Sequence, residues 1–153
     1  MTRIAFDTNI LAYLVGVSRT TSDGAKILQS RDVLARLAGR ASLIAPAQTL
    51  GELCVVLRRA GVPRDEARDT ILKLRHTFAG ADTTDTTLIS ALDLSVAHRL
   101  QIWDAIILNA ATESGCAILL SEDMPDGFVW QGVTVVNPLK IDIHPRLGEV
   151  LNG

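Results

Sequence analysis

Four acidic side chains stand at positions where the sequence shows no partner of opposite charge. Asp7 and Asp123 each follow a short apolar run, RIAF and AILLS. Glu52 directly precedes the apolar run LCVVL, and Asp104 lies within IWDAIILNAA. A carboxylate among apolar neighbours is costly unless it is paired, protonated or bound to a metal ion. Together these acids indicate a site at which a cation supplies the missing positive charge.

A divalent cation is the kind of ligand that such a set favours. If the four acids converge, their mutual repulsion raises their pKa values unless a cation is bound. The candidate ligands are hard carboxylate oxygens, and His76, His98 and His144 are scattered without ligand spacing. Oxygen ligands without a histidine cluster favour Mg²⁺ or Mn²⁺. The sequence leaves the number of ions open.

Each acid also has a structural explanation when it is taken alone. Asp7 and Asp104 can serve as N-caps of the helices that follow them, because Asp is a preferred capping residue. Asp123 lies in SEDMPDG, where turn chemistry accounts for Asp and Gly. A distant arginine could pair with Glu52. The conjunction of the four favours the functional interpretation.

Short apolar runs alternate with longer segments of helical spacing. The runs predict strands at 3–6, 42–45, 117–121 and 133–136. The longer segments predict helices at 7–16, 23–39, 46–61, 63–80, 85–101 and 103–115. This alternation predicts an α/β sandwich in which helix predominates around a parallel sheet. Asp7 and Asp123 would then follow the carboxyl ends of strands, where open α/β sheets bind ligands.

Composition limits the classes of protein that fit. With 153 residues, 48% of them hydrophobic, we expect one domain spanning 1–153. The net charge of −2 provides no general basic field for nucleic acid or an anionic membrane. Cys54 and Cys116 lie far apart without a metal-binding pattern, so we expect free thiols in a reducing compartment. No stretch approaches the ~20 apolar residues of a membrane span, and we expect a cytoplasmic protein.

The acids and their surroundings resemble those of a known family. DTN at 7–9, Glu52 in QTLGELCVVL, Asp104 in WDA and Asp123 in LLSEDMPDG are similar to the motifs of PIN-domain nucleases. The chain length and LLSEDMPDG are most similar to VapC-type toxins of bacterial toxin–antitoxin pairs. The resemblance extends from Ile4 to about Pro138. It implies a PIN-like three-layer α/β/α sandwich with a short, mainly parallel central sheet.

The resemblance also implies an activity and a set of residues. A metal-dependent endoribonuclease would hold Mg²⁺ or Mn²⁺ with Asp7, Glu52, Asp104 and Asp123, and Asp126 matches an additional acid of some members. Asn9, Ser121 and Thr8 could orient metal-bound waters or carboxylates, as outer hydrogen bonds commonly do. The expected partners are an RNA substrate, a cognate antitoxin and a second copy of the chain.

Basic residues gather after Glu52 and could guide RNA phosphates beside an acidic site. They are Arg58, Arg59, Arg64, Arg68, Lys73 and Arg75. A solvated helix face is their usual explanation. Two Trp, one Tyr and three Phe are too few for an extensive base-stacking surface, and we interpret Trp103 as a packing residue.

Three other classes remain as alternatives. A phosphoacceptor receiver domain also clusters acids near strand ends, but it places paired acids after the first strand, where this chain has DTN. An aspartate-nucleophile phosphatase wants a second Asp at the position of Asn9. A non-catalytic acidic module would use the same acids only to bind a basic partner.

Overall fold

A six-stranded sheet forms the centre of the computed structural model, which describes residues 1–153. The strands are β1 (Thr2–Phe6), β2 (Ala41–Pro46), β3 (Ala79–Ala81), β4 (Ile118–Leu120), β5 (Val129–Trp130) and β6 (Val133–Val136). Their order across the sheet is β3-β2-β1-β4-β6-β5. All neighbouring strands run parallel except β5 and β6. The predicted mainly parallel sheet is confirmed.

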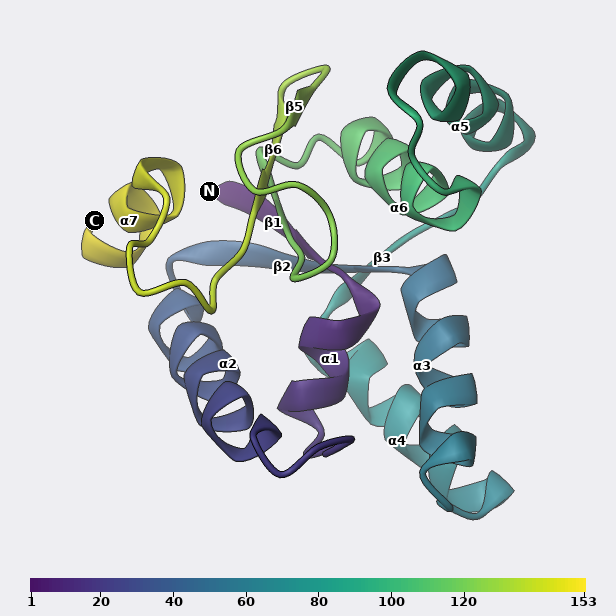
Figure 1. The fold of residues 1–153 in the computed structure, drawn as a ribbon, viewed down its shortest axis with the longest axis vertical. Helices are drawn as coiled ribbons and strands as arrows, with labels where there is room; N and C mark the ends of the chain where they lie inside the picture. Colours follow the sequence, from purple (N-terminus) through teal and green to yellow (C-terminus); the bar gives the residue numbers. More distant parts are fainter.

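Helices cover both faces of this sheet (Figure 1). They are α1 (Thr8–Leu14), α2 (Asp23–Leu37), α3 (Ala47–Arg59), α4 (Arg64–Thr77), α5 (Asp85–His98), α6 (Ile102–Glu113) and α7 (Pro145–Asn152). Side chains of α1 to α4 and α7 share one apolar cluster with Ile4 and Phe6 of β1. Side chains of α5 and α6 share a second cluster with Ala5. Because successive strand residues point to opposite faces, this division confirms the three-layer α/β/α sandwich.

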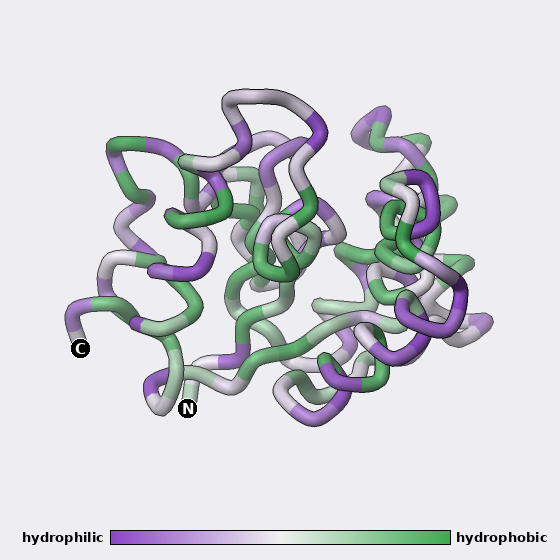
Figure 2. The backbone as a smooth tube through the Cα atoms, turned by 90° about the horizontal axis from the view of Figure 1, so that it is seen from below, coloured by the Kyte–Doolittle hydropathy of each residue, from purple (hydrophilic) through white to green (hydrophobic).

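The middle strands are apolar because both of their faces are covered. Ile4, Ala5 and Phe6 are fully buried, and so is every residue of β6. Continuous apolar runs are typical of parallel strands buried on both sides. Figure 2 shows the same distribution, with mostly hydrophobic residues along the chain segments at the centre of the molecule. The four strands and six helices that the sequence predicted are therefore present, with ends shifted by a few residues.

Three elements differ from the predictions. The helix predicted at 63–80 ends at Thr77, Phe78 is extended, and the next residues form β3. The burial of Phe78 against Phe6, with ring centroids 5.0 Å apart, explains why the chain leaves the helix there. The two-residue strand β5 follows no pattern that the sequence could reveal. Helix α7 lies in the weakly patterned tail after Asn137 and buries Leu147 and Leu151.

Two expectations about the chain as a whole can be compared with the structure. Cys54 and Cys116 are both free, as expected. No helix is sufficiently long and apolar to cross a membrane.

Candidate metal centre

The four predicted carboxylates line one pocket of about 420 Å³ at an edge of the sheet. Asp7 follows β1, Asp123 lies three residues after β4, and these two strands are neighbours. Glu52 projects from α3 and Asp104 from the first turn of α6. The structure thus brings together acids that are up to 116 positions apart in the chain. We call this the carboxylate pocket.

Asp7 combines a capping role with an unfavourable burial. Its Oδ1 accepts a hydrogen bond of 2.7 Å from the backbone N–H of Thr8, and its Oδ2 accepts one of 2.7 Å from Ser121 Oγ. Only 4% of Asp7 is exposed. Burial raises its pKa to about 6, against the opposing effect of the two hydrogen bonds, and the charges of Asp104 and Glu52 add to the increase. The cap and the pocket position therefore coexist.

Glu52 is held by neutral donors. Thr8 Oγ1 donates to its Oε2 at 2.6 Å, and Gln48 Nε2 donates to its Oε1 at 3.0 Å. These contacts connect α3 to the start of α1 and fix the carboxylate at the pocket wall. No arginine pairs with Glu52, so the structural alternative that required one is wrong.

Asp104 is the third residue of α6, and Gln101 occupies the N-cap position. The proposed capping explanation for Asp104 is therefore wrong. The side chain is half-buried. Its pKa is raised chiefly by this burial and further by the negative charges of Glu52 and Asp123. A nearby cation would therefore favour the charged form of Asp104, as it would that of Asp7.

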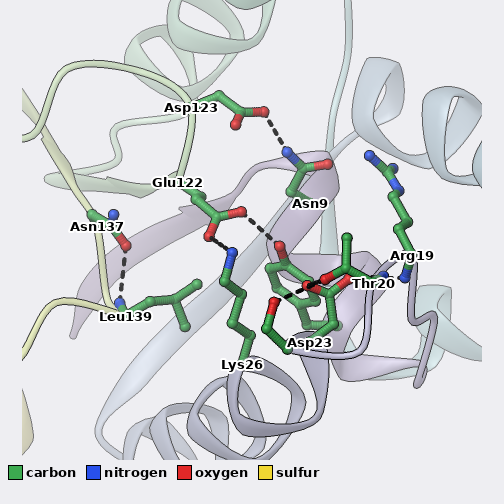
Figure 3. A network of polar contacts seen from close by, with 11 residues as sticks. Asn9, Arg19, Thr20, Asp23, Lys26, Glu122, Asp123, Asn137 and Leu139 are labelled. Carbon is green, nitrogen blue, oxygen red and sulfur yellow. Dashed lines mark hydrogen bonds and ion pairs between the residues drawn. The ribbon is translucent and has the colours of Figure 1, made fainter.

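Asp123 lies at the exposed side of the pocket, where Asn9 Nδ2 donates a hydrogen bond to its Oδ2 (Figure 3). The adjacent Glu122 has other partners: one carboxylate oxygen accepts a bond of 2.6 Å from Tyr13 Oη, and the other lies 2.8 Å from Lys26 Nζ. Glu122 thereby ties the loop after β4 to α1 and α2. This attachment fixes the segment that presents Asp123.

The predicted outer residues each contact a carboxylate. Thr8 donates to Glu52, Asn9 donates to Asp123, and Ser121 donates to Asp7. Ser121 Oγ also accepts from the backbone of Met124, which fixes the hydroxyl. All three have the geometry of side chains that orient carboxylates.

Asp126 lies outside the carboxylate pocket. Its Oδ1 accepts a hydrogen bond of 2.7 Å from the backbone N–H of Asn137, and its Oδ2 lies 3.4 Å from Lys140 Nζ. These partners hold Asp126 against the segment that follows β6. The structure separates it from the four acids, and we exclude it from the candidate ligands.

No basic side chain neutralises the four acids. The ion pairs of the chain are Lys26–Glu122, Arg36–Asp32, Arg68–Asp69 and Lys140–Asp126. Two arginines, Arg19 and Arg59, nevertheless line the carboxylate pocket. Arg58 and Arg64 line a neighbouring hollow that also includes Arg59. Of the predicted RNA contacts, therefore, only Arg59 reaches the pocket itself.

Six residues that line the pocket were not assigned to the site from the sequence, namely Arg19, Gln48, Val55, Val56, Gln101 and Trp103. Arg19 belongs to the segment 16–24, which has no regular pattern, and no sequence signal distinguished it. Trp103 is 51% exposed and lines the pocket beside Asp104, so its interpretation as a packing residue is wrong. The adjacency of Trp103 to the candidate ligand Asp104 is the one signal in the sequence that could have indicated its position.

The donor set fits a hard cation that keeps part of its water. Every acidic side chain of the pocket offers carboxylate oxygens. The pKa values of Asp7 and Asp104 are raised chiefly by burial and further by the negative charges of neighbouring acids, so a nearby cation would favour their charged forms. Nowhere in the chain are three acidic, cysteine or histidine side chains clustered closely enough to enclose a metal ion. Mg²⁺ is usually held by one or two carboxylates and several waters. An open pocket of this kind therefore suits Mg²⁺ better than an enclosed site that would remove all of its bound water.

Comparisons with known proteins agree with this architecture. A family model described as PIN domain matches residues 4–124. Among curated proteins, none matches the sequence. The solved structures that are similar include VapC20 of Mycobacterium tuberculosis, a toxin that cleaves the sarcin–ricin loop, with 18% identity and a TM-score of 0.61. That match covers 78% of this chain and 89% of VapC20.

Two further structures are toxin–antitoxin complexes. VapBC2 of Rickettsia felis, bound to a promoter DNA fragment, matches with 12% identity and a TM-score of 0.65. A toxin–antitoxin complex of Klebsiella pneumoniae matches with 21% identity and a TM-score of 0.62. Each match covers 88% of this chain and 97% of the other. At these identities the likeness concerns the fold. Because the family model spans most of the chain and includes all four pocket acids, the chain belongs to the PIN-domain family.

Proposed function

We propose that residues 1–153 form a single nuclease domain that hydrolyses RNA phosphodiesters with Mg²⁺ or Mn²⁺. The observation that carries this proposal is the carboxylate pocket, in which four acids from four elements meet without a cationic partner. Membership of the PIN-domain family argues against the receiver-domain and phosphatase alternatives. It also supports the ribonuclease over the non-catalytic module, which is tested below.

In the proposed reaction a water adds to the phosphorus atom, the bond to the leaving oxygen breaks, and that oxygen takes up a proton. A divalent cation, when bound, supplies the positive charge that activates the water and offsets charge on the phosphate. Asp7, Glu52, Asp104 and Asp123 would hold it. No histidine or cysteine lines the pocket. The acids alone define the chemistry.

The residues around the acids would keep them in position during turnover. Ser121 and the backbone of Thr8 fix the two oxygens of Asp7, and Thr8 Oγ1 with Gln48 fixes those of Glu52. Fixed ligands reduce the reorganisation that binding would otherwise require. Asp7 must lose its proton to hold a cation, so its raised pKa in the metal-free chain predicts that the affinity for Mg²⁺ or Mn²⁺ declines below about pH 6.

The test is cleavage of labelled total RNA by the purified chain with Mg²⁺ or Mn²⁺, with chelator, and by Asp104→Asn. The variant keeps the side-chain shape and removes one ligand charge, so folding should persist while cleavage falls by orders of magnitude. Asp126→Asn is the matched control, because Asp126 is an acid near the site that lies outside the pocket. It should cleave at a rate close to that of the native chain.

Cleavage by Asp104→Asn at the native rate, or activity that persists in chelator, would refute the proposal. Binding of a basic partner without any cleavage, together with no effect of expression on growth, would favour the non-catalytic module.

We further propose that the domain is the toxin of a toxin–antitoxin pair. Two of the similar structures are toxin–antitoxin complexes, and four unpaired acids suit an arginine from an inhibiting partner, because guanidinium binds carboxylates well. An antitoxin segment bearing arginine would then occupy the carboxylate pocket. Inhibition that survives charge reversal of that arginine would refute this arrangement.

A homodimer is also part of the proposal. Leu88, Ile89, Leu92 and Val96 of α5 form the largest group of exposed apolar side chains on one helix, with Val96 83% exposed. Burial of such a face against a second copy would remove apolar area from water. We propose the cytoplasm as the compartment, which is consistent with two free cysteines and an RNA substrate.

A further inference from the structure

A second hollow adjoins the carboxylate pocket and carries the opposite charge. It has a volume of about 370 Å³ and is lined by Val17, Ser18, Arg19, Val56, Arg59 and Ala60. Arg19, Val56 and Arg59 line both hollows, so the two are continuous. We call the second one the arginine pocket. Neither arginine forms an ion pair with a carboxylate of the chain.

The backbone around Arg19 is fixed although the segment is exposed. Val17 is 8% exposed, and its N–H donates to Ala12 O at 2.9 Å, which anchors the chain after α1. The buried carboxylate of Asp23 accepts hydrogen bonds from the backbone N–H of Arg19 at 2.8 Å and of Thr20 at 3.2 Å. The first of these is the main cause of the lowered pKa of Asp23.

Figure 3 shows the side chain of Arg19 extending from this anchored segment in the direction of Asn9, itself a residue of the carboxylate pocket. Arg59 reaches the same place from the last turn of α3. Two guanidinium groups from separate elements therefore flank the acids on one side.

The opposite side of the carboxylate pocket has no such cation. The hollow there shares Gln48, Glu52 and Val55 with the pocket, and its remaining residues include Asp82, Thr83 and Thr84. An RNA backbone approaching the acids thus meets positive charge on one side and negative charge on the other. Because the chain has a net charge of −2, a polyanion needs such a local attraction to enter.

We propose that Arg19 and Arg59 form a phosphate subsite that binds the RNA backbone on one side of the cleaved bond. This inference rests on the proposed ribonuclease function and specifies how the same site takes its substrate. Guanidinium groups suit phosphate because their donors form two parallel hydrogen bonds with its oxygens. Arg58 and Arg64, in the hollow that shares Arg59, would extend the path toward the turn between α3 and α4.

The test measures RNA binding separately from cleavage. All variants are made in the Asp104→Asn chain, and binding of a short fluorescent single-stranded oligoribonucleotide is followed by anisotropy over a range of KCl concentrations. Each phosphate contact contributes about 0.7 to the slope of log K against log salt. Loss of both arginines in Arg19→Gln/Arg59→Gln should reduce the slope by about 1.4, and affinity at physiological salt should fall roughly fifteenfold.

Arg146→Gln is the matched control. Arg146 is exposed on α7, far from the pocket, and forms no ion pair. It should leave the slope unchanged, and circular dichroism should show that all variants are folded. In the cleavage-competent chain the double substitution should raise KM and leave kcat near its native value.

Because anisotropy needs no cleavage, failure of the subsite and failure of the nuclease proposal give different results. If the native chain cleaves no RNA but the slope of log K against log salt still depends on the two arginines, only the nuclease proposal is refuted. A slope that is the same in the double variant and its parent, or that falls equally in Arg146→Gln, would overturn the phosphate subsite and leave Arg59 as a stabiliser of the C-terminus of α3.

Discussion

The burial of Asp7 should make the metal-free protein less stable than it would be with a neutral side chain. In the folded chain Asp7 keeps its proton up to about pH 6, whereas an unfolded chain releases it near the ordinary value of 3.8. The folded state therefore binds more protons between these values, and stability falls as the pH rises through this window. Asp7→Asn removes the charge while Asn keeps a good N-cap.

The size of the effect follows from the two pKa values. A difference between about 6 and 3.8 corresponds to about 3 kcal/mol when the group is fully ionised. By the same relation, the destabilisation caused by Asp7 is only about 1 kcal/mol at a pH of about 4.5. For a chain of this length, 1 kcal/mol shifts Tm by roughly 2 to 4 °C. In chelator, Asp7→Asn should thus raise Tm by roughly 6 to 12 °C at about pH 7.5 and by only a few degrees at about pH 4.5.

The assay is thermal unfolding by circular dichroism at both pH values, with Asp126→Asn beside Asp7→Asn. Asp126 holds the backbone of Asn137 and lies near Lys140, so its substitution should lower Tm or leave it unchanged. A lower Tm for Asp7→Asn than for the native chain at neutral pH would refute the reasoning. So would a gain of equal size at both pH values, because it would not come from ionisation.

The remaining predictions concern the cation, the loop that carries Asp123 and the face of α5. Mg²⁺ should stabilise the native chain by about 2.7 kcal/mol at a concentration one hundredfold above Kd, which a rise in Tm would report. The rise should be much smaller in Asp7→Asn, and an equal rise in both chains would argue against the carboxylate pocket as the binding site. Tyr13, the sole tyrosine, should titrate by ultraviolet absorbance at a pKa of about 12, raised by burial and then by Glu122, and Glu122→Gln should lower that value; titration near 10 in the native chain would contradict the contact. Ile89→Glu should convert a dimer to a monomer in light scattering, and a native chain that is monomeric at high concentration would refute the dimer.

The parts of the fold that the sequence predicted are those whose pattern comes from burial. The strands at residues 3–6 and 133–136 are mostly apolar because helices cover both faces, so their composition reveals them. β3 is Ala-Gly-Ala and β5 has two residues, too few for a period to appear. Helix α7 did carry signals, namely Pro145 at its first turn and Leu147 and Leu151 four residues apart. Their short span after an irregular segment hid them.

Some residues of the candidate site could be predicted from the order of strands and helices, whereas others depend on contacts that only the folded chain shows. Asp7 and Asp123 follow neighbouring parallel strands, so their proximity follows from topology. Arg19 was not predicted, because its position depends on Asp23, which fixes the backbone of an exposed segment. Side chains placed by loop hydrogen bonds leave no periodic trace in the sequence.

Asp123 and Asp126 illustrate the limit most clearly, because they lie three residues apart in one loop and have the same chemistry. The sequence treats both as acids after a strand. In the structure Asp126 obtains a backbone donor from Asn137 and a nearby lysine, whereas Asp123 obtains only the neutral amide of Asn9. An acid with a charge partner helps to hold the fold, and an acid without one retains the capacity to bind a cation. Two features that only the folded chain reveals, the position in the carboxylate pocket and the absence of a charge partner, therefore separate Asp123 from Asp126.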